Sequence, residues 1–478
     1  MKVLSVASEV YPLVKTGGLA DVAGALPGAL AGQGVDMRTL MPGYPKVLSA
    51  LTEAESVYAF PSLYGGPAQL IAGKAGGLNL LVLDAAHLFV RDGGPYGDST
   101  GKDWPDNWMR FAALSRAAAT IAEVGAGDFK PDIVHVHDWQ AALTSAFLKY
   151  GPASATPSII TVHNIAFQGQ YAADIFPALG LPQAAYAVDG VEYYGGVGFL
   201  KAGLQCSWAI TTVSPTYAQE IRTPEFGMGL NGLINARHAN VHGIVNGIDI
   251  DVWNPETDTH IAKTFSAKNM AGREVNRKAL AKRFKLTAGD GPVFIVISRL
   301  TFQKGLDVLA ASIDQIVTMG GRLAVLGTGD PYIEGAIVAA AGRHPGKVGV
   351  VIGYDEALSH LMQAGGDAIL IPSRFEPCGL TQLYGVRYGC VPVVARTGGL
   401  ADTIIDANDA ALSMNVATGI QFAPVDLGPM QDAIRRTINL FRDKAAWSHL
   451  QETGMRADVS WDRSAARYAR LYKSLLKK

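Results

Sequence analysis

The sequence has 478 residues but only three cysteines, and no Cys-x-x-Cys pair occurs among them. This spacing excludes a disulfide scaffold and is typical of a reducing compartment. No apolar run approaches the ~20 residues of a membrane-spanning helix, and Glu9 interrupts the first apolar run before a signal-peptide core can form. The formal net charge of −1 gives no indication of a nucleic-acid partner. We therefore expect a cytoplasmic protein that binds neither membrane nor nucleic acid.

Two common nucleotide-binding motifs are also missing. The nearest match to a P-loop, GDSTGKD at 97–103, is one residue short and ends in Asp where Ser or Thr is required. The glycines after the first apolar run have the wrong spacing for a dinucleotide fingerprint, and Lys15 interrupts them. The sequence therefore predicts neither type of phosphate loop.

Metal-ligating patterns are weak. HVHD at 135–138 resembles the start of a metallohydrolase motif, but the residues that follow supply no further ligands. Asp249 and Asp251 have the spacing of an Asp-x-Asp metal site, but they lie in a polar turn where we expect exposure to solvent. We expect no metal and no cofactor. A hydrolase that uses HVHD is the alternative, and loss of activity in chelator would support it.

Short apolar runs alternate with longer, helix-compatible stretches along the whole chain. The runs begin at Lys2, Leu78, Asp132, Ser158, Ala209 and Val241 in the first half and at Val293, Arg322, Lys347, Asp367 and Val391 in the second. Runs that are apolar at nearly every position are typical of parallel strands buried on both faces. Their alternation with helices predicts an α/β fold of two doubly wound, Rossmann-like domains facing a deep interdomain cleft.

We place the domain boundary in the polar turn near residue 250. The N-terminal domain is predicted to span 1–250 and the C-terminal domain 251–459. The final stretch, 460–478, reads as one amphipathic helix, and we assign it to the N-terminal domain, although the sequence alone does not say where it packs. Ligands of such folds bind at the carboxyl ends of the strands, so we look for functional residues there.

One hexapeptide, TGGLAD, occurs at 16–21 and again at 397–402, each time after a basic residue, Lys15 or Arg396. We expect the two copies to occupy equivalent strand–turn–helix corners of the two domains. Adjacent glycines allow close backbone approach, and a helix N-terminus favours anions. The simpler interpretation is that the glycines only permit tight packing. The neighbouring cation favours anion binding, more strongly for Lys15 than for Arg396.

Polar side chains gather at the predicted strand ends, and in a doubly wound fold such positions converge. They are Asp138, His163, Asn164, Asn246, Arg299, Lys304 and Glu376. Arg299 and Lys304 form a cationic pair suited to a diphosphate, and the CGLT segment after Glu376 opens a helix whose N–H groups can reach phosphate. A single such residue is often only a strand-end or solvated side chain, but several together indicate a ligand site.

In combination these motifs resemble a known family. They are SEVYPLVKTGGLADV from Ser8, RDGGPYGD from Arg91, DNWMRF from Asp106, HVHDW from His135, TVHN from Thr161, NGID from Asn246, SRLTFQKG from Ser298 and EPCGLTQLYG from Glu376. The set is similar to bacterial glycogen synthases and plant starch synthases, retaining glucosyltransferases of glycosyltransferase family 5 with the GT-B architecture. The resemblance covers nearly the whole chain, including the terminal helix.

The resemblance implies transfer of glucose from ADP-glucose to the non-reducing 4-hydroxyl end of an α-1,4-glucan such as glycogen, without a metal. Lys15 and Gly18 would line the diphosphate, and Arg299 and Lys304 would neutralise the departing phosphate. The remaining implied contacts are base stacking by Tyr354, phosphate and sugar binding by Cys378, Gly379, Leu380 and Thr381, glucosyl contacts by Asp138, His163, Asn164, Asn246 and Glu376, and acceptor or sugar contacts by Asp21 and Tyr96. Glu376, His163, Arg299 and Lys304 form the implied catalytic set.

One position departs from the pattern of related retaining transferases. They carry a second Glu after Glu376 and seven intervening residues, but Tyr384 stands there. Retaining glycosidases need two close carboxylates, and no convincing pair is present in these motifs. We therefore favour attack on the same face as the leaving group, with the phosphate taking the acceptor proton, over a covalent intermediate.

Two other classes of function remain open at this point. A GT-B transferase with another nucleotide sugar or acceptor would keep the same phosphate contacts, because nothing in Tyr354 alone selects adenine. A non-catalytic glucan-binding protein would need exposed aromatic platforms, but the seven Trp residues are scattered and form no stripe.

Overall fold

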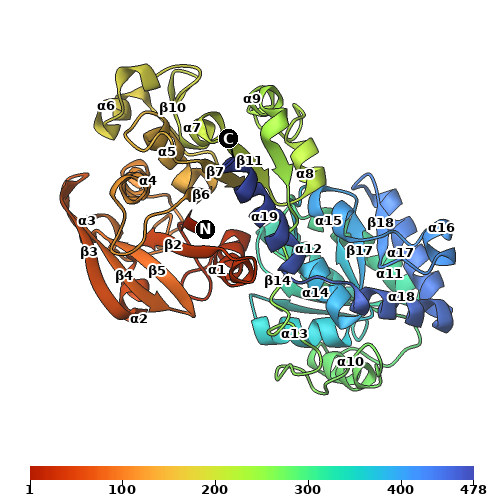
Figure 1. Ribbon diagram of the computed structural model, residues 1–478. Coiled ribbons are helices and arrows are strands. Elements are labelled where there is room, and N and C mark those ends of the chain that lie inside the picture. The colour runs from red at the N-terminus through yellow and green to blue at the C-terminus, as the bar shows by residue number, and fades with distance from the viewer. Residues whose placement is uncertain (478) are drawn as a thin grey trace. The chain divides into compact units, whose positions relative to one another are not determined.

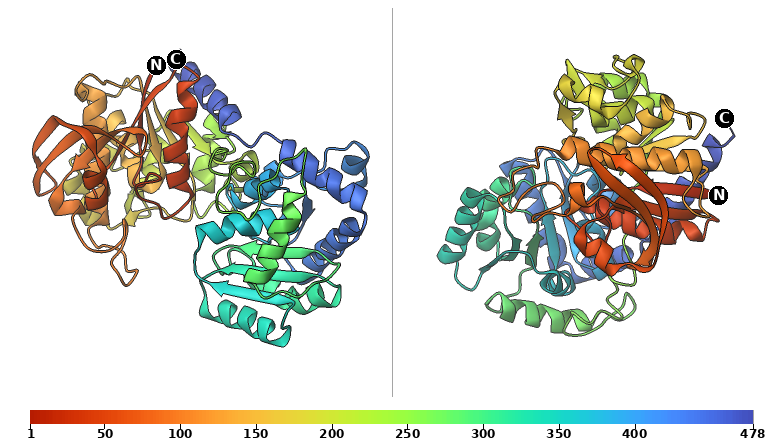
Figure 2. Two further views of the ribbon diagram at one scale, coloured as in Figure 1. Left: turned by 90° about the horizontal axis from the view of Figure 1, so that it is seen from below. Right: turned by 90° about the vertical axis from the view of Figure 1, so that its left-hand side faces the viewer.

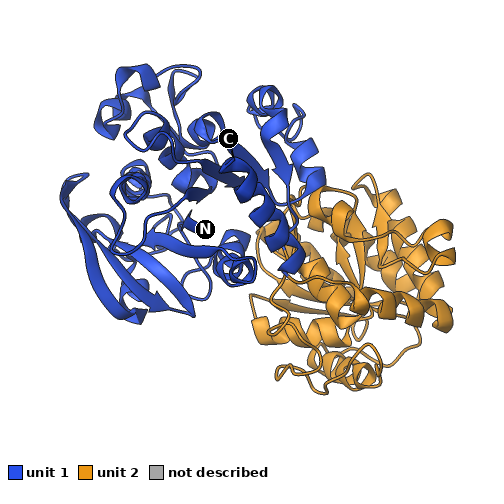
Figure 3. Cartoon of the chain, in the orientation of Figure 1, with its two compact units in different colours: residues 1–246, 461–478 blue, residues 247–460 orange. Residues whose placement is uncertain are grey.

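The computed structural model describes residues 1–477. They form two compact units, 1–246 with 461–477 (unit 1) and 247–460 (unit 2), which are coloured separately in Figure 3. Both units are α/β, so the predicted pair of doubly wound domains is confirmed. None of the helices within residues 1–477 combines the length and the apolar character needed to span a bilayer.

Unit 1 is built on a sheet with the strand order β12-β11-β7-β6-β1-β2-β5-β4-β3. Its strands are β1 (Lys2–Val6), β2 (Asp36–Pro42), β3 (Thr52–Leu63), β4 (Gly66–Ala75), β5 (Leu78–Asp84), β6 (Ile133–His137), β7 (Ser158–Val162), β11 (Ala209–Thr212) and β12 (Val241–Gly243). All pairings are parallel except those of β3 with β4 and of β4 with β5. Apart from β3 and β4 at one end of the sheet, this is the doubly wound arrangement.

The helices of unit 1 (Figure 1) are α1 (Gly18–Ala31), α2 (Pro45–Ala50), α3 (Ala86–Phe89), α4 (Asn107–Val124), α5 (Asp138–Lys149), α6 (Phe176–Leu179), α7 (Phe199–Cys206), α8 (Pro215–Glu220), α9 (Asn231–Ala236) and α19 (Asp462–Leu475). A small antiparallel sheet of β8 (Gln170–Tyr171), β9 (Glu192–Tyr193) and β10 (Gly196–Gly198) lies in the excursion after β7. The terminal helix α19 lies beside α1, as the dark blue and red helices of Figure 2 show.

One face of the unit 1 sheet is covered by α1 and α19. Apolar side chains of β1, β2, β6, β7 and β11 form a single core cluster with those of the two helices, including Val3, Ile133, Tyr468 and Tyr472. The terminal helix therefore completes the core of unit 1, although more than 200 residues separate it from the rest of that unit.

Unit 2 has the strand order β15-β14-β13-β16-β17-β18, the 3-2-1-4-5-6 order of a Rossmann fold. Its strands are β13 (Val293–Ile297), β14 (Arg322–Gly327), β15 (Val348–Ile352), β16 (Ala368–Ile371), β17 (Val391–Ala395) and β18 (Ile420–Phe422). Its helices are α10 (Gly272–Arg283), α11 (Leu306–Thr318), α12 (Pro331–Arg343), α13 (Glu356–Gly365), α14 (Thr381–Tyr388), α15 (Gly398–Thr403), α16 (Asp409–Ser413), α17 (Leu427–Arg442) and α18 (Lys444–Arg456).

Alternate residues of β13 show why its sequence is apolar throughout. Phe294 and Val296 belong to the cluster formed with α11, α12 and α17, whereas Val293 and Ile295 belong to the cluster formed with α10 and α13. Both faces of this strand are buried, as the continuous apolar run predicts.

Candidate active site

In unit 1 the predicted residues follow three adjacent strands. Asp138 begins α5 directly after β6, His163 and Asn164 follow β7, and the loop with Lys15 follows β1. The boundary between β1 and β6 is the point at which the strand order reverses. The sequence therefore brings these residues to the position where doubly wound sheets bind ligands.

Asp138 has a structural task at this edge. Its Oδ1 accepts hydrogen bonds from the backbone N–H groups of His163 (2.7 Å) and Asn164 (3.4 Å). Burial raises the pKa of Asp138 to about 7, although the two N–H donors act in the opposite direction. Its φ of +53° lies in the left-handed region, which is uncommon for a residue other than glycine. The carboxyl group thus holds the turn that carries His163.

His163 is held from inside the protein by a second histidine. Its Nε2 lies 3.0 Å from Nδ1 of His137, whose Nε2 lies 3.2 Å from Oγ of Ser5. Burial is the main cause that lowers the pKa of both histidines, that of His137 to about 3. Both rings are therefore neutral near pH 7, so His163 can act as a hydrogen-bonding group but not as a fixed cation.

Glu9 was not among the predicted site residues, yet it organises the loop after β1. It is 3% exposed, and its carboxylate accepts hydrogen bonds from the backbone N–H of Thr16, from the Thr16 hydroxyl (2.8 Å) and from the Tyr96 hydroxyl (2.7 Å). The backbone N–H of Gly17 also points to it (3.3 Å). Part of the glycine turn is therefore bound to an internal carboxylate. Sequence spacing gave no signal for this, because the contact depends on how the loop folds back.

Lys15 lies at the start of α1. Its ammonium forms an ion pair with Asp21 (2.8 Å) in the first turn of that helix, and both side chains are partly exposed. A Cβ atom on Gly18 would meet nothing within 4 Å, so the start of α1 is open. The Tyr96 hydroxyl is bound to Glu9 and to Ser8 (2.7 Å). Lys15, Gly18, Asp21 and Tyr96 thus share one surface around the α1 N-terminus.

Asn246 ends the part of unit 1 that precedes the polar turn. Its side chain is 7% exposed, and its Oδ1 has no hydrogen-bond partner within residues 1–477. Buried polar atoms are rarely left unpaired. Asn164, by contrast, uses its Oδ1 to accept the N–H of Ala166 (3.0 Å). Oδ1 of Asn246 is therefore available to accept a hydrogen bond from a ligand.

In unit 2 the predicted cation and carboxylate meet directly. Lys304, in the loop after β13, places its Nζ 2.6 Å from Oε2 of Glu376, which follows β16. Ser373 donates a second hydrogen bond to the same oxygen (2.8 Å). β13 and β16 are adjacent strands at the reversal of strand order. This ion pair lies where the ligand site of a Rossmann fold is expected.

Arg299 lies five residues before Lys304 and is exposed. Within residues 1–477 its guanidinium forms no hydrogen bond and no ion pair. The loop around it is braced by Arg374, which binds both carboxylate oxygens of Asp307 (2.7 and 2.9 Å) and stacks on Phe302 at 3.7 Å. The guanidinium of Arg299 is therefore available to bind an anion, on a loop that Arg374 holds in place.

The CGLT segment leads into α14. Cys378 is buried, Gly379 has a φ of +71°, and Thr381 is the first residue of the helix. Tyr354 follows β15 and is 76% exposed, with its hydroxyl donating to Glu356 (2.9 Å). The predicted residues of unit 2 thus lie at carboxyl ends of strands, and Lys304 and Glu376 are in direct contact.

The two TGGLAD copies are not equivalent, contrary to expectation. The first follows β1, the first strand of unit 1, whereas the second follows β17, the fifth strand of the Rossmann order in unit 2. Gly17 and Gly18 are exposed, and an added Cβ would meet nothing. A Cβ on Gly399 would lie 2.2 Å from the carbonyl oxygen of Cys378. The simpler interpretation, tight packing, therefore holds for the second copy.

The second copy contacts the backbone of Glu376. The N–H of Gly399 donates to the carbonyl oxygen of Glu376 (3.1 Å). Nε of Arg396 donates to Oε1 of Gln421 (2.9 Å), and the residue is exposed. The expectation of an anion site at this copy stays a prediction.

Tyr384, where related transferases have a second Glu, is part of an aromatic stack. Its ring lies parallel to that of Trp253 at 3.7 Å, and His360 covers the opposite face of Trp253 at 3.8 Å. His360 in turn contacts Asp258 (2.7 Å). The position carries an apolar packing role, which agrees with assigning it no role as a carboxylate.

HVHD is likewise explained by packing. His135 lies 2.8 Å from the Tyr472 hydroxyl and 2.6 Å from that of Thr161. Both ring nitrogens of His137 are also engaged, by Ser5 and His163. Within residues 1–477, no group of three or more His, Cys, Asp or Glu side chains is arranged to hold a metal ion.

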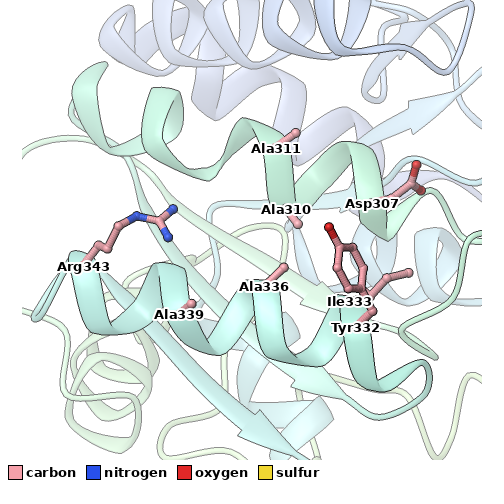
Figure 4. Close-up of a pocket in the computed structure, with 8 residues that line it drawn as sticks. All are labelled: Asp307, Ala310, Ala311, Tyr332, Ile333, Ala336, Ala339 and Arg343. Carbon is pink, nitrogen blue, oxygen red and sulfur yellow. The ribbon is translucent and has the colours of Figure 1, made fainter.

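A hollow of about 300 Å³ lies elsewhere on unit 2, between α11 and α12. Figure 4 shows the alanines that line it on both helices, with Tyr332 and Arg343 near opposite ends of α12. No predicted site residue lines it, and it lies against helices rather than at strand ends. The chemistry of the strand ends, not this hollow, identifies the candidate site.

Comparison with known proteins agrees with this arrangement. Residues 2–236 match the family described as Starch synthase catalytic domain, and residues 278–441 match Glycosyl transferases group 1. The chain is 63% identical over 478 residues to the Glycogen synthase of Mesorhizobium japonicum, with 100% of this chain and 99% of the relative covered. The chain belongs to the glycogen and starch synthase family.

Other proteins of this family are also similar to the chain over its whole length. The Glycogen synthase of Novosphingobium aromaticivorans is 61% identical over 479 residues, covering 100% of this chain and 99% of its own. The solved catalytic domain of Starch Synthase IV from Arabidopsis thaliana superposes with a TM-score of 0.88 at 32% identity, covering 100% and 99%. A Sucrose-phosphate synthase from Thermosynechococcus elongatus, 17% identical with a TM-score of 0.60, shares the fold alone. The protein is a GT-B glucosyltransferase with glycogen (starch) synthase activity.

Proposed function

We propose that this cytoplasmic enzyme transfers glucose from ADP-glucose to the non-reducing 4-hydroxyl end of an α-1,4-glucan, with retention and without a metal or cofactor. The observation that carries the proposal is the Lys304–Glu376 pair at the strand-order reversal of unit 2, with Arg299 on the same loop. The related Arabidopsis starch synthase was solved with ADP and acarbose, and these correspond to the two substrate classes proposed here.

The charges account for the chemistry. Breaking the anomeric C–O bond builds negative charge on the diphosphate, and donors that meet this charge stabilise the transition state more than the ground state. Arg299 supplies a planar fork of donors suited to phosphate. Lys304 has three ammonium protons, so it can bind phosphate while it retains Glu376. Lys15 and Gly18 of unit 1 are proposed to contact the same diphosphate.

The glucosyl ring is proposed to bind between hydrogen-bonding groups rather than charges. His163 is neutral, and Oδ1 of Asn246 is buried and unpaired, so both suit sugar hydroxyls. Glu376 accepts from Lys304 and Ser373 through one oxygen, Oε2, which leaves Oε1 for a hydroxyl group. Asp138 is proposed to act on the sugar through the turn that it holds. Asn164, Asp21 and Tyr96 are proposed to lie near sugar or acceptor.

The remaining contacts concern the nucleotide. Tyr354 exposes its ring for stacking on the base, and the segment Cys378, Gly379, Leu380 and Thr381 presents the start of α14 to phosphate and sugar. We retain same-face attack as the mechanism. In its support, Asp138 is engaged by backbone N–H groups and Glu376 by Lys304 and Ser373, whereas retaining glycosidases use two close carboxyl groups, one of them as nucleophile.

The deciding assay supplies labelled ADP-glucose or UDP-glucose with glycogen, in the presence and absence of EDTA, and measures label in polymer. We expect incorporation from ADP-glucose that EDTA does not change. Incorporation from UDP-glucose alone would indicate another donor, and metal-dependent sugar release without polymer growth would indicate a hydrolase.

Two variants test the residue roles in the same assay. Arg299→Gln should lower kcat by about 10²–10³-fold, the range typical for loss of one transition-state donor, whereas Lys282→Ala on the exposed side of α10 should have no effect. Glu376→Ala should abolish turnover without a trappable glycosyl-enzyme adduct. A stable adduct on any carboxylate, detected by mass spectrometry of the intact protein, would contradict same-face attack.

A further inference from the structure

A row of polar side chains crosses the buried face of the unit 1 sheet beneath α1 and α19. In register, these residues share a face with apolar core residues that lie two positions earlier on each strand, or four positions earlier for His137. We call the hydrogen-bonded members the polar row: Ser5, His135, His137, Thr161 and Thr211. All are at most 1% exposed. Buried polar groups are costly unless satisfied, so the direction of each hydrogen bond in the row can be worked out.

In the half of the row around His135, one assignment of donors and acceptors gives every donor a partner. Thr211 donates to the carbonyl oxygen of Ile160 (3.4 Å), so it accepts from Thr161 (2.5 Å). Thr161 then accepts from His135 Nε2–H (2.6 Å). His135 Nδ1 therefore accepts from the Tyr472 hydroxyl (2.8 Å). Every donor has a partner, and His135 carries its proton on Nε2.

In the half of the row around His137, the Ser5 hydroxyl decides the direction of the hydrogen bonds. Within residues 1–477, the only hydrogen-bond partner of the Ser5 hydroxyl is Nε2 of His137. If His137 donated to Ser5, the hydroxyl proton of Ser5 would be buried without an acceptor. If Ser5 donates, Nε2 of His137 is the acceptor and its Nδ1–H donates to Nε2 of His163. Only the second direction leaves no buried donor of Ser5, His137 or His163 unpaired, because Nδ1 of His163 is not a buried atom.

We propose that Ser5 and His137 are positioning residues that fix the tautomer of His163, so that His163 presents Nδ1–H as a hydrogen-bond donor to an oxygen of the transferred sugar. The sugar as ligand rests on the proposed function, but the tautomer does not. Nδ1 of His163 is not among the buried unpaired atoms and has no partner within residues 1–477. The neighbouring histidines, two residues apart on β6, thus carry their protons on opposite nitrogens.

Ser5 and His137, two buried polar residues, thereby have a function behind His163. A free imidazole interconverts between tautomers, and each offers the opposite character at Nδ1. A sugar hydroxyl can donate or accept, so a fixed N–H selects one orientation of that hydroxyl. The chain from Ser5 therefore determines what His163 offers at the edge of the sheet.

The direct test is nitrogen-15 NMR of the full chain labelled at histidine, recorded without substrate. Multiple-bond spectra distinguish Nδ1–H from Nε2–H rings. We expect Nδ1–H at His137 and His163 and Nε2–H at His135, with the signals assigned by single His→Asn variants. An Nε2–H signal at His163 would overturn the inference. Because no substrate is present, this result does not depend on which reaction the enzyme catalyses.

A matched pair of variants isolates the Ser5 hydroxyl. Ser5→Thr and Ser5→Val add similar bulk, but only the first retains the hydroxyl. Ser5→Thr should keep the Nδ1–H signal of His163, whereas Ser5→Val should lose it and lower kcat at least tenfold relative to Ser5→Thr. Thr39→Val, on the neighbouring strand, should leave the tautomer unchanged, because Oγ1 of Thr39 has no partner within residues 1–477.

The outcomes separate the two proposals. Equal His163 spectra and equal kcat in Ser5→Thr and Ser5→Val would contradict the positioning role, even if glucan synthesis is confirmed. The expected spectra in a protein that fails to extend glycogen would contradict the proposed function and leave the tautomer assignment intact. If neither Ser5 variant folds, the wild-type spectrum still decides the tautomer.

Discussion

Asp138 shows how burial changes the role of a single carboxyl group. The side chain is 8% exposed and accepts two backbone N–H groups of the turn that carries His163. Burial outweighs these donors and raises its pKa from 3.8 to about 7. At this scale, the sequence identifies the residue as a strand-end carboxylate, but only its surroundings determine its protonation state.

This pKa predicts a pH dependence of stability. In the unfolded chain Asp138 ionises near pH 4, whereas the folded chain retains the proton until about pH 7. The folded state therefore binds more protons in this interval, and the contribution to stability is full below pH 4 and is lost as the pH rises to 7. We expect the stability of wild type relative to Asp138→Asn to fall as the pH rises across this interval and to level off above it.

Chemical denaturation at pH 5, 6, 7 and 8 measures this difference. Asp251→Asn, at an exposed position of the polar turn, provides the control and should show a constant difference from wild type. A constant difference for Asp138→Asn as well would show that burial does not retain the proton.

Tyr384 gives a second prediction at the residue scale. Tyr384→Glu would introduce the second carboxylate of related retaining transferases, but it would remove the ring stacked on Trp253. We expect a loss of stability of about 1–3 kcal/mol and no gain in glucosyl transfer. Tyr384→Phe, which keeps the ring, should lose less. Thermal unfolding and the polymer assay test both variants, and a more active Tyr384→Glu would show that the position takes part in the chemistry.

At the scale of elements, the repeated hexapeptide shows that identical residues can serve different purposes. The first copy opens α1, a helix of 14 residues, on an exposed surface, whereas the second opens the six-residue α15 against the backbone of 376–378. The difference arises because the copies follow the first strand of one sheet and the fifth strand of the other. Local sequence does not contain this information.

The two copies provide a matched pair of variants. Gly399→Ala forces a Cβ into the backbone of Cys378 and should destabilise the protein by several kcal/mol or prevent folding, since overpacking and backbone clashes give the large effects. Gly17→Ala has open space and an extended φ of −154°, so its stability should change by less than about 1 kcal/mol. Thermal unfolding of both variants measures the contrast. Similar losses would show that the first copy is also packed.

Elements differed in how well they could be predicted. The central strands β13 and β14 were predictable because both faces are buried and their sequences are apolar at nearly every position. β1 and β6 were predictable because apolar residues alternate there with the buried Ser5, His135 and His137. The β3–β4 hairpin, β2 and β18 were not predicted. β3 is largely exposed on both faces, so its sequence carries no apolar run, and its antiparallel pairing departs from the expected pattern of parallel strands.

At the scale of the whole molecule, the terminal helix decides which fragments can fold. Trp461 and, from α19 directly after it, Tyr468, Tyr472 and Leu475 belong to the core that covers one face of the unit 1 sheet. The core clusters of unit 2 lie within 247–460. Unit 2 is therefore continuous in sequence, whereas unit 1 needs both ends of the chain.

We expect a fragment of residues 247–460 to unfold cooperatively on its own. A fragment of residues 1–246 should be unfolded or aggregated because the α19 face of its sheet is exposed, and linking 461–478 to it should restore cooperative unfolding. Circular dichroism and calorimetry of the three fragments test this. A stable 1–246 fragment would show that α19 is dispensable for the core.

The sequence alone was sufficient for the α/β class, for the family and for the set of polar residues at strand ends, because two-sided burial and strand-end motifs leave local patterns. Only the tertiary structure decided which of these residues touch. The contacts of Glu9 with the glycine turn, of Lys304 with Glu376, and of Ser5 with His137 join segments up to 132 residues apart. Such contacts depend on strand order and loop paths, which arise from packing of the whole unit and leave no spacing in the chain.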